Sequence, residues 1–463
     1  MVRQNYNGYN KKPMTEILAL LQPLEHSISK TTLKQMSRII MAMIAMSGRI
    51  TMLGISRWAE TGGSYRSIQR FFHTCIPWSQ VFWDFFRNNL MREEDVYLLV
   101  GDESVVTKSG KKTYGVDYFF SNLLKQVVPS LSFFTLALVN VKERRSYPIS
   151  IQQTIRSAEE KANSQIKKQA RKAKEAGPKR KRGRPKGSCN KKKEEKMPNP
   201  ELERIKKMVQ ELLEMIAGKV QLTYLVLDGH FGNHPALKMV RECHLQLISK
   251  LRSDAALYFQ HTEPRSGPGR PRKFGKKLDY QHIPDRYLQK TEVEGGIETR
   301  IYQLQLLNHE FSVPLNVVVL IKTNLETKAW AHVVLFSSDL ELSYDKLIDF
   351  YSLRFQIEFN FRDAKQFWGL EDFMNVHPTA VTNAANLSLF MVNVSQLLMC
   401  RYRKDDPDFS VLDLKAYYRG YRYVTETIKI LPNLPDDNLI SQLFQKVTAL
   451  GRIHPPKSPV FSG

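Results

Sequence analysis

The 463-residue sequence predicts an α/β protein with an all-helical N-terminal part and a β-rich insertion. Three observations support this fold class. Apolar residues recur at helical spacing through 14–92, and two later apolar runs, 96–102 and 222–228, each end in an aspartate. The segment 344–368 contains neither Gly nor Pro and has the length of a helix. Because strands and helices alternate, we expect one layered α/β core.

Charge is the first indication of function. The net charge is +23, and two basic segments carry most of it: 161–196 has 16 Lys or Arg against 3 Glu, and 265–277 has 6 Lys or Arg and no acid. Such concentrated charge is typical of segments that bind polyanions, most commonly nucleic acid, through neutralised phosphates and released counterions.

Other compositional features exclude several classes. The four cysteines, Cys75, Cys189, Cys243 and Cys400, form no C-x-x-C pair, so the sequence indicates neither a disulfide framework nor a zinc site. The first twelve residues lack the apolar core of a signal peptide, and polar residues interrupt the most apolar stretch, 380–400. We therefore expect a protein of a reducing cytoplasm, without a membrane span.

The N-terminal helical part offers a candidate DNA-reading element. In 64–73, Arg66 and Arg70 lie one turn apart, while Ile68, Phe71 and Phe72 are available for a core. This pattern fits a helix-turn-helix-like reader. An ordinary helical packing domain with incidental arginines is nearly as good an interpretation.

A change of period marks the first strand. The run 96–102 is apolar and ends in Asp102, as a buried strand would. Alternation places Asp102 on the face of Leu98 and Val100, with Glu103 on the opposite face. The runs 131–141 and 147–153 predict two further strands, joined by a polar turn, and the three together predict a meander.

The first basic segment contains Arg182-Gly183-Arg184-Pro185, which resembles an AT-hook. Such an extended Arg-Gly-Arg lies in the narrow minor groove of A·T-rich DNA. Residues 268–273, with Arg270 and Arg272, repeat the pattern less completely. The alternative is a disordered basic linker with electrostatic affinity alone.

The second aspartate follows a predicted amphipathic helix, 201–217. Leu222 to Asp228 is an apolar run that ends in a carboxylate, followed by a Gly-rich turn and a helix from about His234. Strand, carboxylate, turn and helix is how α/β proteins present ligands at the carboxyl ends of strands. Taken alone, such an aspartate is more often a helix cap or a turn former.

Beyond it, 247–338 predicts mostly strands, near 301–307 and 317–323, with a basic loop at 264–277. We interpret this region as an insertion, because the next helical element completes the core. A buried helix is expected at 379–403.

The helix predicted for 344–368 carries the densest set of candidate site residues. On a helical wheel, Tyr351, Arg354, Glu358 and Lys365 fall within roughly 60° of arc. Beside that arc runs an apolar stripe, so these polar groups lie at the edge of a core. The stripe consists of Phe350, Leu353, Ile357, Phe361, Ala364 and Trp368. The alternative is a helix with an internal i,i+4 ion pair between Arg354 and Glu358.

Asp102, Asp228 and Glu358, two on strands and one on a helix, resemble the acidic triad of the DDE transposases of bacterial insertion sequences. Tyr351, Arg354, Glu358 and Lys365 match the Y-(2)-R-(3)-E-(6)-K signature of one large subgroup. The resemblance spans roughly 95–370. It departs from that subgroup where Gly229-His230, rather than an Arg, follows the second aspartate.

The resemblance implies an RNase H-like catalytic core, a mixed sheet flanked by helices. It also sets the domains that we expect: a helical domain, 1–93; the first part of the core, 94–250, interrupted by the basic segment 158–198; the insertion, 251–340; the completion of the core, 341–405; and a C-terminal region, 406–463.

By the same resemblance, Asp102, Asp228 and Glu358 hold two Mg²⁺ or Mn²⁺ ions for phosphodiester hydrolysis and strand transfer. Arg354 and Lys365 would grip DNA phosphates, and Tyr351 would donate to an oxygen or serve as a core-edge tyrosine. Double-stranded DNA is the expected partner, both transposon ends and target. A homodimer in the synaptic complex and a cytoplasmic, nucleoid-associated location in a bacterium are also expected.

Two other functions stay open at this point. One is a catalytically idle, AT-hook-type DNA-binding protein derived from a transposase. The other is an RNase H-like metal nuclease that cuts without joining strands.

Overall fold

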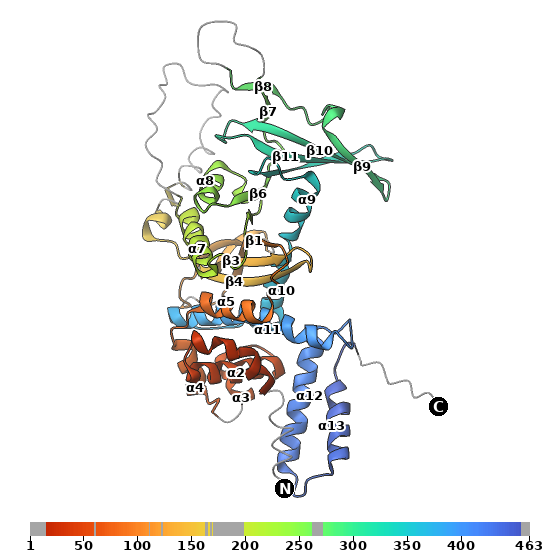
Figure 1. The fold of residues 1–463 in the computed structure, drawn as a ribbon. Coiled ribbons are helices and arrows are strands. Elements are labelled where there is room, and N and C mark those ends of the chain that lie inside the picture. Colours follow the sequence, from red (N-terminus) through yellow and green to blue (C-terminus); the bar gives the residue numbers. More distant parts are fainter. Residues whose placement is uncertain are drawn as a thin grey trace, which may run out of the picture.

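The computed structural model describes residues 15–59, 62–110, 112–121, 124–162, 165–166, 169, 199–261 and 272–454. Helices lie at one end of the molecule and the strands of the insertion region at the other, with the core sheet between them (Figure 1). The AT-hook-like arginines Arg182 and Arg184, and also Arg270, lie outside the described residues.

Short helices build the N-terminal part. Serine and threonine side chains accept hydrogen bonds from backbone N–H groups at the starts of three of them, through Ser29, Thr51 and Ser64. Such caps satisfy donors that have no partner within the helix. The elements are η1 (Gln22–His26), α2 (Lys30–Ala45), α3 (Met52–Trp58), α4 (Tyr65–His73) and α5 (Trp78–Asn89).

The core sheet has the strand order β4-β3-β1-β5-β6. Strand β3 runs antiparallel to β1 and β4, while β1, β5 and β6 run parallel to one another. The expected mixed sheet is thus present, and the strand β2 extends it beside β3. The bounds are β1 (Tyr97–Thr107), β2 (Asp117–Ser121), β3 (Gln126–Asn140), β4 (Arg145–Gln153), β5 (Tyr224–Val226) and β6 (Gln246–Leu251).

Helices flank this sheet on both sides (Figure 1). On one side α7 (Pro200–Ile216) packs against β3 and α8 (His234–Glu242) packs against β6. On the other, α9 (Tyr344–Leu353) contacts β6, and α10 (Gln356–Phe367) contacts β1 and β4. An α/β core of this kind fits the RNase H-like architecture that the resemblance implies.

The insertion region is rich in strands, as expected, but its strands continue the core sheet instead of forming a separate one. Strand β12 pairs with β6 of the core, and β11, β10, β7 and β8 follow outward. Pairing with β6 satisfies an edge that would otherwise be open. The bounds are β7 (Leu257–Gln260), β8 (Phe274–Lys277), η3 (Asp285–Tyr287), β9 (Leu288–Glu294), β10 (Ile297–Asn308), β11 (Leu315–Asn324) and β12 (Trp330–Ser337).

The buried helix expected near 379–403 is α11 (Pro378–Tyr402), and it joins the N-terminal helices to the core. Phe390 in its middle contacts the rings of Trp78, Phe82 and Phe85 at centroid distances of 6.1, 5.5 and 5.0 Å. Asn383 accepts a hydrogen bond of 2.7 Å from the indole N–H of Trp78. These contacts anchor the helical N-terminal part to the rest of the molecule.

Two helices form the C-terminal end, α12 (Val411–Ile430) and α13 (Asp437–Ala449), which pack side by side (Figure 1). A capping box between Ser410 and Asp413 starts α12. Across the described part of the chain, no helix combines the length and the apolar character that a membrane crossing requires.

Candidate active site

Asp102 and Asp228 lie level with each other on neighbouring parallel strands. Leu99 pairs with Leu225 and Val100 with Val226, so each aspartate comes two residues after the same paired position. The prediction that Asp102 ends its strand is wrong, because β1 continues to Thr107. What ends there is the pairing with the much shorter β5, and this leaves the two carboxylates beside an open stretch of β1.

Asp102 has a perturbed carboxyl group. Burial raises the pKa of its carboxyl group to about 6, and the negative charges of Asp228 and Glu358 act in the same direction. The Arg354 guanidinium and the Glu103 backbone N–H oppose that rise; the Arg354 Nη1 to Asp102 Oδ2 distance is 2.8 Å. Asp228 and Glu358 are therefore close enough for their charges to act on Asp102.

Asp228 lies at the start of a short turn. Its Oδ1 accepts a hydrogen bond of 3.0 Å from the backbone N–H of His230, so it does cap η2 (Gly229–Phe231). Ser249 Oγ donates to the backbone carbonyl of Asp228 at 2.7 Å and ties the turn to β6. The turn also needs Gly232, because a Cβ there would meet the Lys250 carbonyl oxygen at 2.2 Å.

Glu358 lies in the first turn of α10. The single helix predicted for 344–368 is instead two helices, α9 and α10, with a break at Arg354 and Phe355. Hydrogen bonds at the break span three residues, as in a 3₁₀ turn: Arg354 N–H donates to the Tyr351 carbonyl and Glu358 N–H to the Phe355 carbonyl. The chain keeps its helical sense, and the predicted apolar stripe is buried throughout.

Arg354 joins two of the three acids. Its Nη1 contacts Asp102, as given above, and its Nη2 lies 3.0 Å from Glu358 Oε1. The i,i+4 ion pair considered as an alternative is therefore present, and it extends to a strand 252 residues away. Arg354 Nε is buried and has no hydrogen-bond partner among the described residues.

The other two signature residues lie close by. Tyr351 is partly buried, 6.0 Å from its ring centroid to the Arg354 guanidinium carbon, and burial raises the pKa of its hydroxyl. Lys365 donates to the Val105 carbonyl oxygen on β1 at 2.8 Å and lies 3.7 Å from Glu371 Oε1. In this structure Lys365 thus links α10 to the strand that carries Asp102.

Three other polar residues do not belong to this cluster. Glu103 points to the opposite face, as predicted, and lines a small hollow together with Glu201 and Arg204 of α7. His230 Nε2 lies 3.5 Å from Glu201 Oε2, and this contact raises the pKa of His230. Arg272 is exposed beside β8, several strands from the three acids.

The side chains of this site offer carboxylate oxygens to the metal that the resemblance implies. Carboxylate oxygens are the ligands that Mg²⁺ and Mn²⁺ prefer. Within the described ranges, no three His, Cys, Asp or Glu side chains are arranged to hold a metal ion. Arg354 lies between Asp102 and Glu358 and neutralises them instead. The carboxylates thus suit a divalent cation by their chemistry. In this structure the positive charge beside Asp102 and Glu358 is the guanidinium of Arg354.

Sequence reasoning missed two contacts that shape this site. Ser249 holds the backbone of Asp228, and Glu371 holds Lys365. No sequence motif around Ser249 or Glu371 indicates either contact. The arc on the helical wheel did indicate that Arg354 and Glu358 share a face, but the bond from Arg354 to Asp102 depends on tertiary packing.

Comparison with known families identifies the superfamily of this chain. A family model described as DDE superfamily endonuclease matches residues 23–305, which is more than half of the chain. The matched range includes Asp102 and Asp228 and ends before Glu358. No curated protein matches the chain.

Proposed function

We propose that this chain, which belongs to the DDE superfamily endonucleases, is a DNA transposase that cleaves insertion-sequence ends and joins them to target DNA. The observation that carries the proposal is the level position of Asp102 and Asp228 on parallel strands, with Glu358 linked to Asp102 through Arg354. Transposition joins DNA ends as well as cutting them, so the proposal adds strand joining to the endonuclease activity of the superfamily.

DDE superfamily endonucleases generally use divalent metal ions. Here Asp102, Asp228 and Glu358 are the residues that would hold Mg²⁺ or Mn²⁺, two ions by the family resemblance. Bound at hard carboxylate oxygens, such ions supply Lewis acidity at the phosphodiester and stabilise the leaving oxygen. The charges that act on Asp102 support this assignment, because the negative charges of Asp228 and Glu358 both reach its carboxyl group and a cation there would offset them.

Arg354 has a second role in this proposal. Its guanidinium now neutralises Asp102 and Glu358, and its Nε has no partner among the described residues. With a divalent cation held by the carboxylates, Arg354 would be free to bind a DNA phosphate, for which its fork of donors is suited. Tyr351, beside it, would donate to the same phosphate.

Lys365 remains a proposed phosphate contact. To reach DNA, its ammonium group would have to leave the Val105 carbonyl and Glu371. The basic segments would hold DNA by charge, with Arg182, Arg184, Arg270 and Arg272 as the proposed contacts. A homodimer that holds two transposon ends together is part of the same proposal.

A cleavage and joining assay tests this function. The full chain is incubated with a labelled duplex carrying the inverted repeats that flank its coding region, a target plasmid, and Mg²⁺ or Mn²⁺. We expect cut ends and joined products from the wild type. Asp228→Ala should abolish both and retain DNA binding, while Glu103→Gln, an acid on the opposite face, should retain both activities.

Two results would contradict the proposal. Cleavage without any joined product would indicate a metal nuclease, an alternative that the family description as an endonuclease also supports. DNA binding with no cleavage under any metal would indicate a catalytically idle, AT-hook-type DNA-binding protein. Loss of DNA binding in Asp228→Ala would assign Asp228 a structural role.

A further inference from the structure

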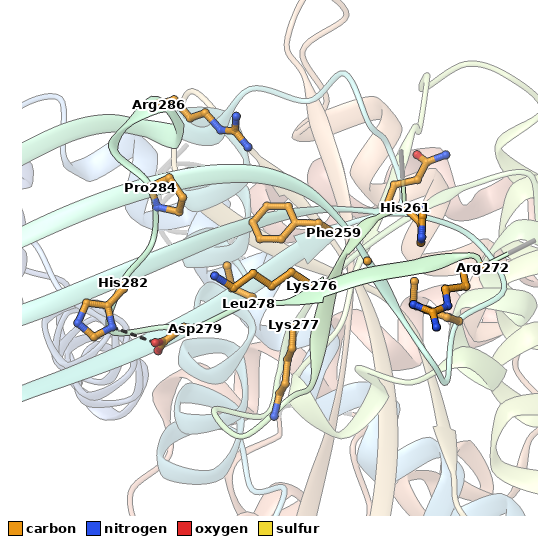
Figure 2. Close-up of a pocket in the computed structure, with 13 residues that line it drawn as sticks. Phe259, His261, Arg272, Lys276, Lys277, Leu278, Asp279, His282, Pro284 and Arg286 are labelled. Atoms are coloured by element: carbon orange, nitrogen blue, oxygen red, sulfur yellow. Dashed lines mark hydrogen bonds and ion pairs between the residues drawn. The ribbon is translucent and has the colours of Figure 1, made fainter. Parts of the chain in front are cut away.

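A strongly basic pocket lies at the end of the sheet that is formed by β7 and β8. It has a volume of about 570 Å³ and is lined by residues 259–261, 272 and 274–279 together with His282, Pro284 and Arg286. Figure 2 shows Phe259 and Lys276 in the middle of the view, Arg286 above them, Arg272 to one side and His282 to the other. The basic side chains that line it are His261, Arg272, Lys276, Lys277, His282 and Arg286.

Acids do little to neutralise this pocket. Asp279 is the single acid among its lining residues, and His282 Nδ1 lies 2.9 Å from Asp279 Oδ2. The other oxygen of Asp279 accepts from the Gln281 backbone N–H at 3.0 Å. Arg272, Lys276 and Lys277 form no ion pair with any carboxylate that the structure describes. The pocket therefore keeps a positive surplus.

The cations come from separate segments, so strand protection alone does not account for them. Lysines on an edge strand deter unwanted strand pairing, and Lys276 and Lys277 lie on the edge strand β8. Arg286 lies in η3, beyond that strand, and its guanidinium is 4.8 Å from the ring centroid of Tyr287. Tyr287 in turn stacks on Phe259 at a centroid distance of 5.7 Å.

We infer that this basic pocket is a second DNA-binding site, which holds backbone phosphates of DNA outside the catalytic centre. Cations from separate segments around the rings of Phe259 and Phe274 suit a phosphate chain with sugars or bases beside it. The choice of DNA as the polyanion rests on the proposed function. The geometry of the pocket does not depend on it.

The pocket is distinct from the three acids. Strand β8 is seven positions from β1 in the order β1-β5-β6-β12-β11-β10-β7-β8. At about 4.8 Å per strand, seven strand spacings separate them by about 34 Å across the sheet. A change in the pocket can therefore alter DNA binding while leaving the catalytic carboxylates in place.

The salt dependence of DNA affinity tests the inference. Binding of the full chain to a fluorescein-labelled 30-bp duplex is measured by anisotropy between 50 and 300 mM KCl, without divalent metal. The pocket variant carries Arg272→Gln, Lys276→Gln and Arg286→Gln. The control variant carries Lys219→Gln, Lys404→Gln and Lys446→Gln, three exposed lysines elsewhere, and so loses the same charge.

Each phosphate contact contributes about 0.9 to the slope of log K against log salt concentration. We expect the slope of the pocket variant to become shallower by about 2 to 3 and that of the control variant by less than 1. Equal slopes in the two variants, or an unchanged slope in the pocket variant, would overturn the inference. A 30-nucleotide single strand, run in parallel, identifies whether duplex or single-stranded backbone occupies the pocket.

Failure of this inference differs visibly from failure of the proposed function. A chain that never cuts DNA but shows the slope difference keeps the pocket and loses the transposase proposal. If the wild type cuts and joins DNA but the pocket and control variants have equal salt slopes, the transposase proposal stands and the pocket inference fails. Should the triple variant fail to fold by thermal melting, Lys276→Gln alone should make the slope shallower by about 0.9, and no change would count against the pocket.

Discussion

Replacing Arg354 by alanine removes the cation that two acids of the candidate site share. Arg354 Nη1 lies 2.8 Å from Asp102 and Nη2 lies 3.0 Å from Glu358, with 14% of the Arg354 side chain exposed. Removing one partner of a buried ion pair costs about 3–5 kcal/mol, because the remaining charge stays buried without compensation. Glu358 is 41% exposed, so we expect the lower end, about 3 kcal/mol.

The loss has a measurable size. Unfolding entropy is about 2.1 cal/mol/K per residue, so a 463-residue chain that unfolds as one unit would lose about 3 °C in Tm. Arg362→Ala is a matched control on the same helix: Arg362 pairs with Asp363 at 2.9 Å and is 57% exposed. Asp363 is only 16% exposed, but Arg362 reaches solvent, which screens the pair, so the control should lose about 1 kcal/mol and about 1 °C.

Scanning calorimetry with and without MnCl₂ checks the reasoning. Without metal, Arg354→Ala should melt below the wild type and below Arg362→Ala. Added Mn²⁺ should raise the Tm of Arg354→Ala more than that of the wild type, because no guanidinium competes for the carboxylates. Equal Mn²⁺ shifts in Arg354→Ala and the wild type, or no loss of Tm without metal, would refute the role assigned to Arg354.

Two further predictions concern other parts of the chain. Gly232→Ala should lower DNA cleavage by about 10²-fold, because the added Cβ would meet the Lys250 carbonyl oxygen at 2.2 Å and shift the Asp228 turn. The control Gly229→Ala, whose added Cβ has its nearest contact at 3.5 Å, should retain activity. Equal cleavage rates in the two variants would contradict this prediction. Lys415 is buried against Trp368, and burial lowers the pKa of its amine to about 7. The unfolded chain binds more protons between pH 7 and 10.5, so stability attributable to Lys415 rises with pH in that window. Lys415→Met should therefore stabilise the protein by about 2–4 kcal/mol at pH 6.5 and by clearly less at pH 9.5, as measured by urea unfolding; a pH-independent difference would contradict the pKa assignment.

The sequence predicted the parts of the site that depend on local periodicity. The apolar stripe beside Glu358 is buried, and Glu103 faces away from Asp102, because side-chain direction follows from helical and strand geometry alone. The mixed sheet and the strand-rich insertion region were also foreseen. These features need only the pattern of apolar residues within one element.

What the sequence could not reveal depends on pairing between distant elements. Asp102 lies in the middle of β1 because β3 continues to pair with β1 after β5 has ended, and no residue near Asp102 signals this. No Gly or Pro in the sequence indicates the helix break at Arg354. Lys365 contacts Val105, 260 residues away, and Glu371, which follows α10; both contacts lie outside the helical pattern that suggested a DNA contact.

Iron-directed cleavage of the chain tests the central claim most directly, namely that three acids distant in sequence hold divalent metal together. The protein is loaded with Fe²⁺ in place of Mg²⁺, treated with ascorbate and peroxide, and its backbone cuts are mapped by mass spectrometry. We expect cuts near 102, 228 and 358 in one preparation, all suppressed by excess Mg²⁺ and all weakened in Asp228→Ala. Cuts near only one of the three positions, or a pattern unaffected by Asp228→Ala, would contradict it.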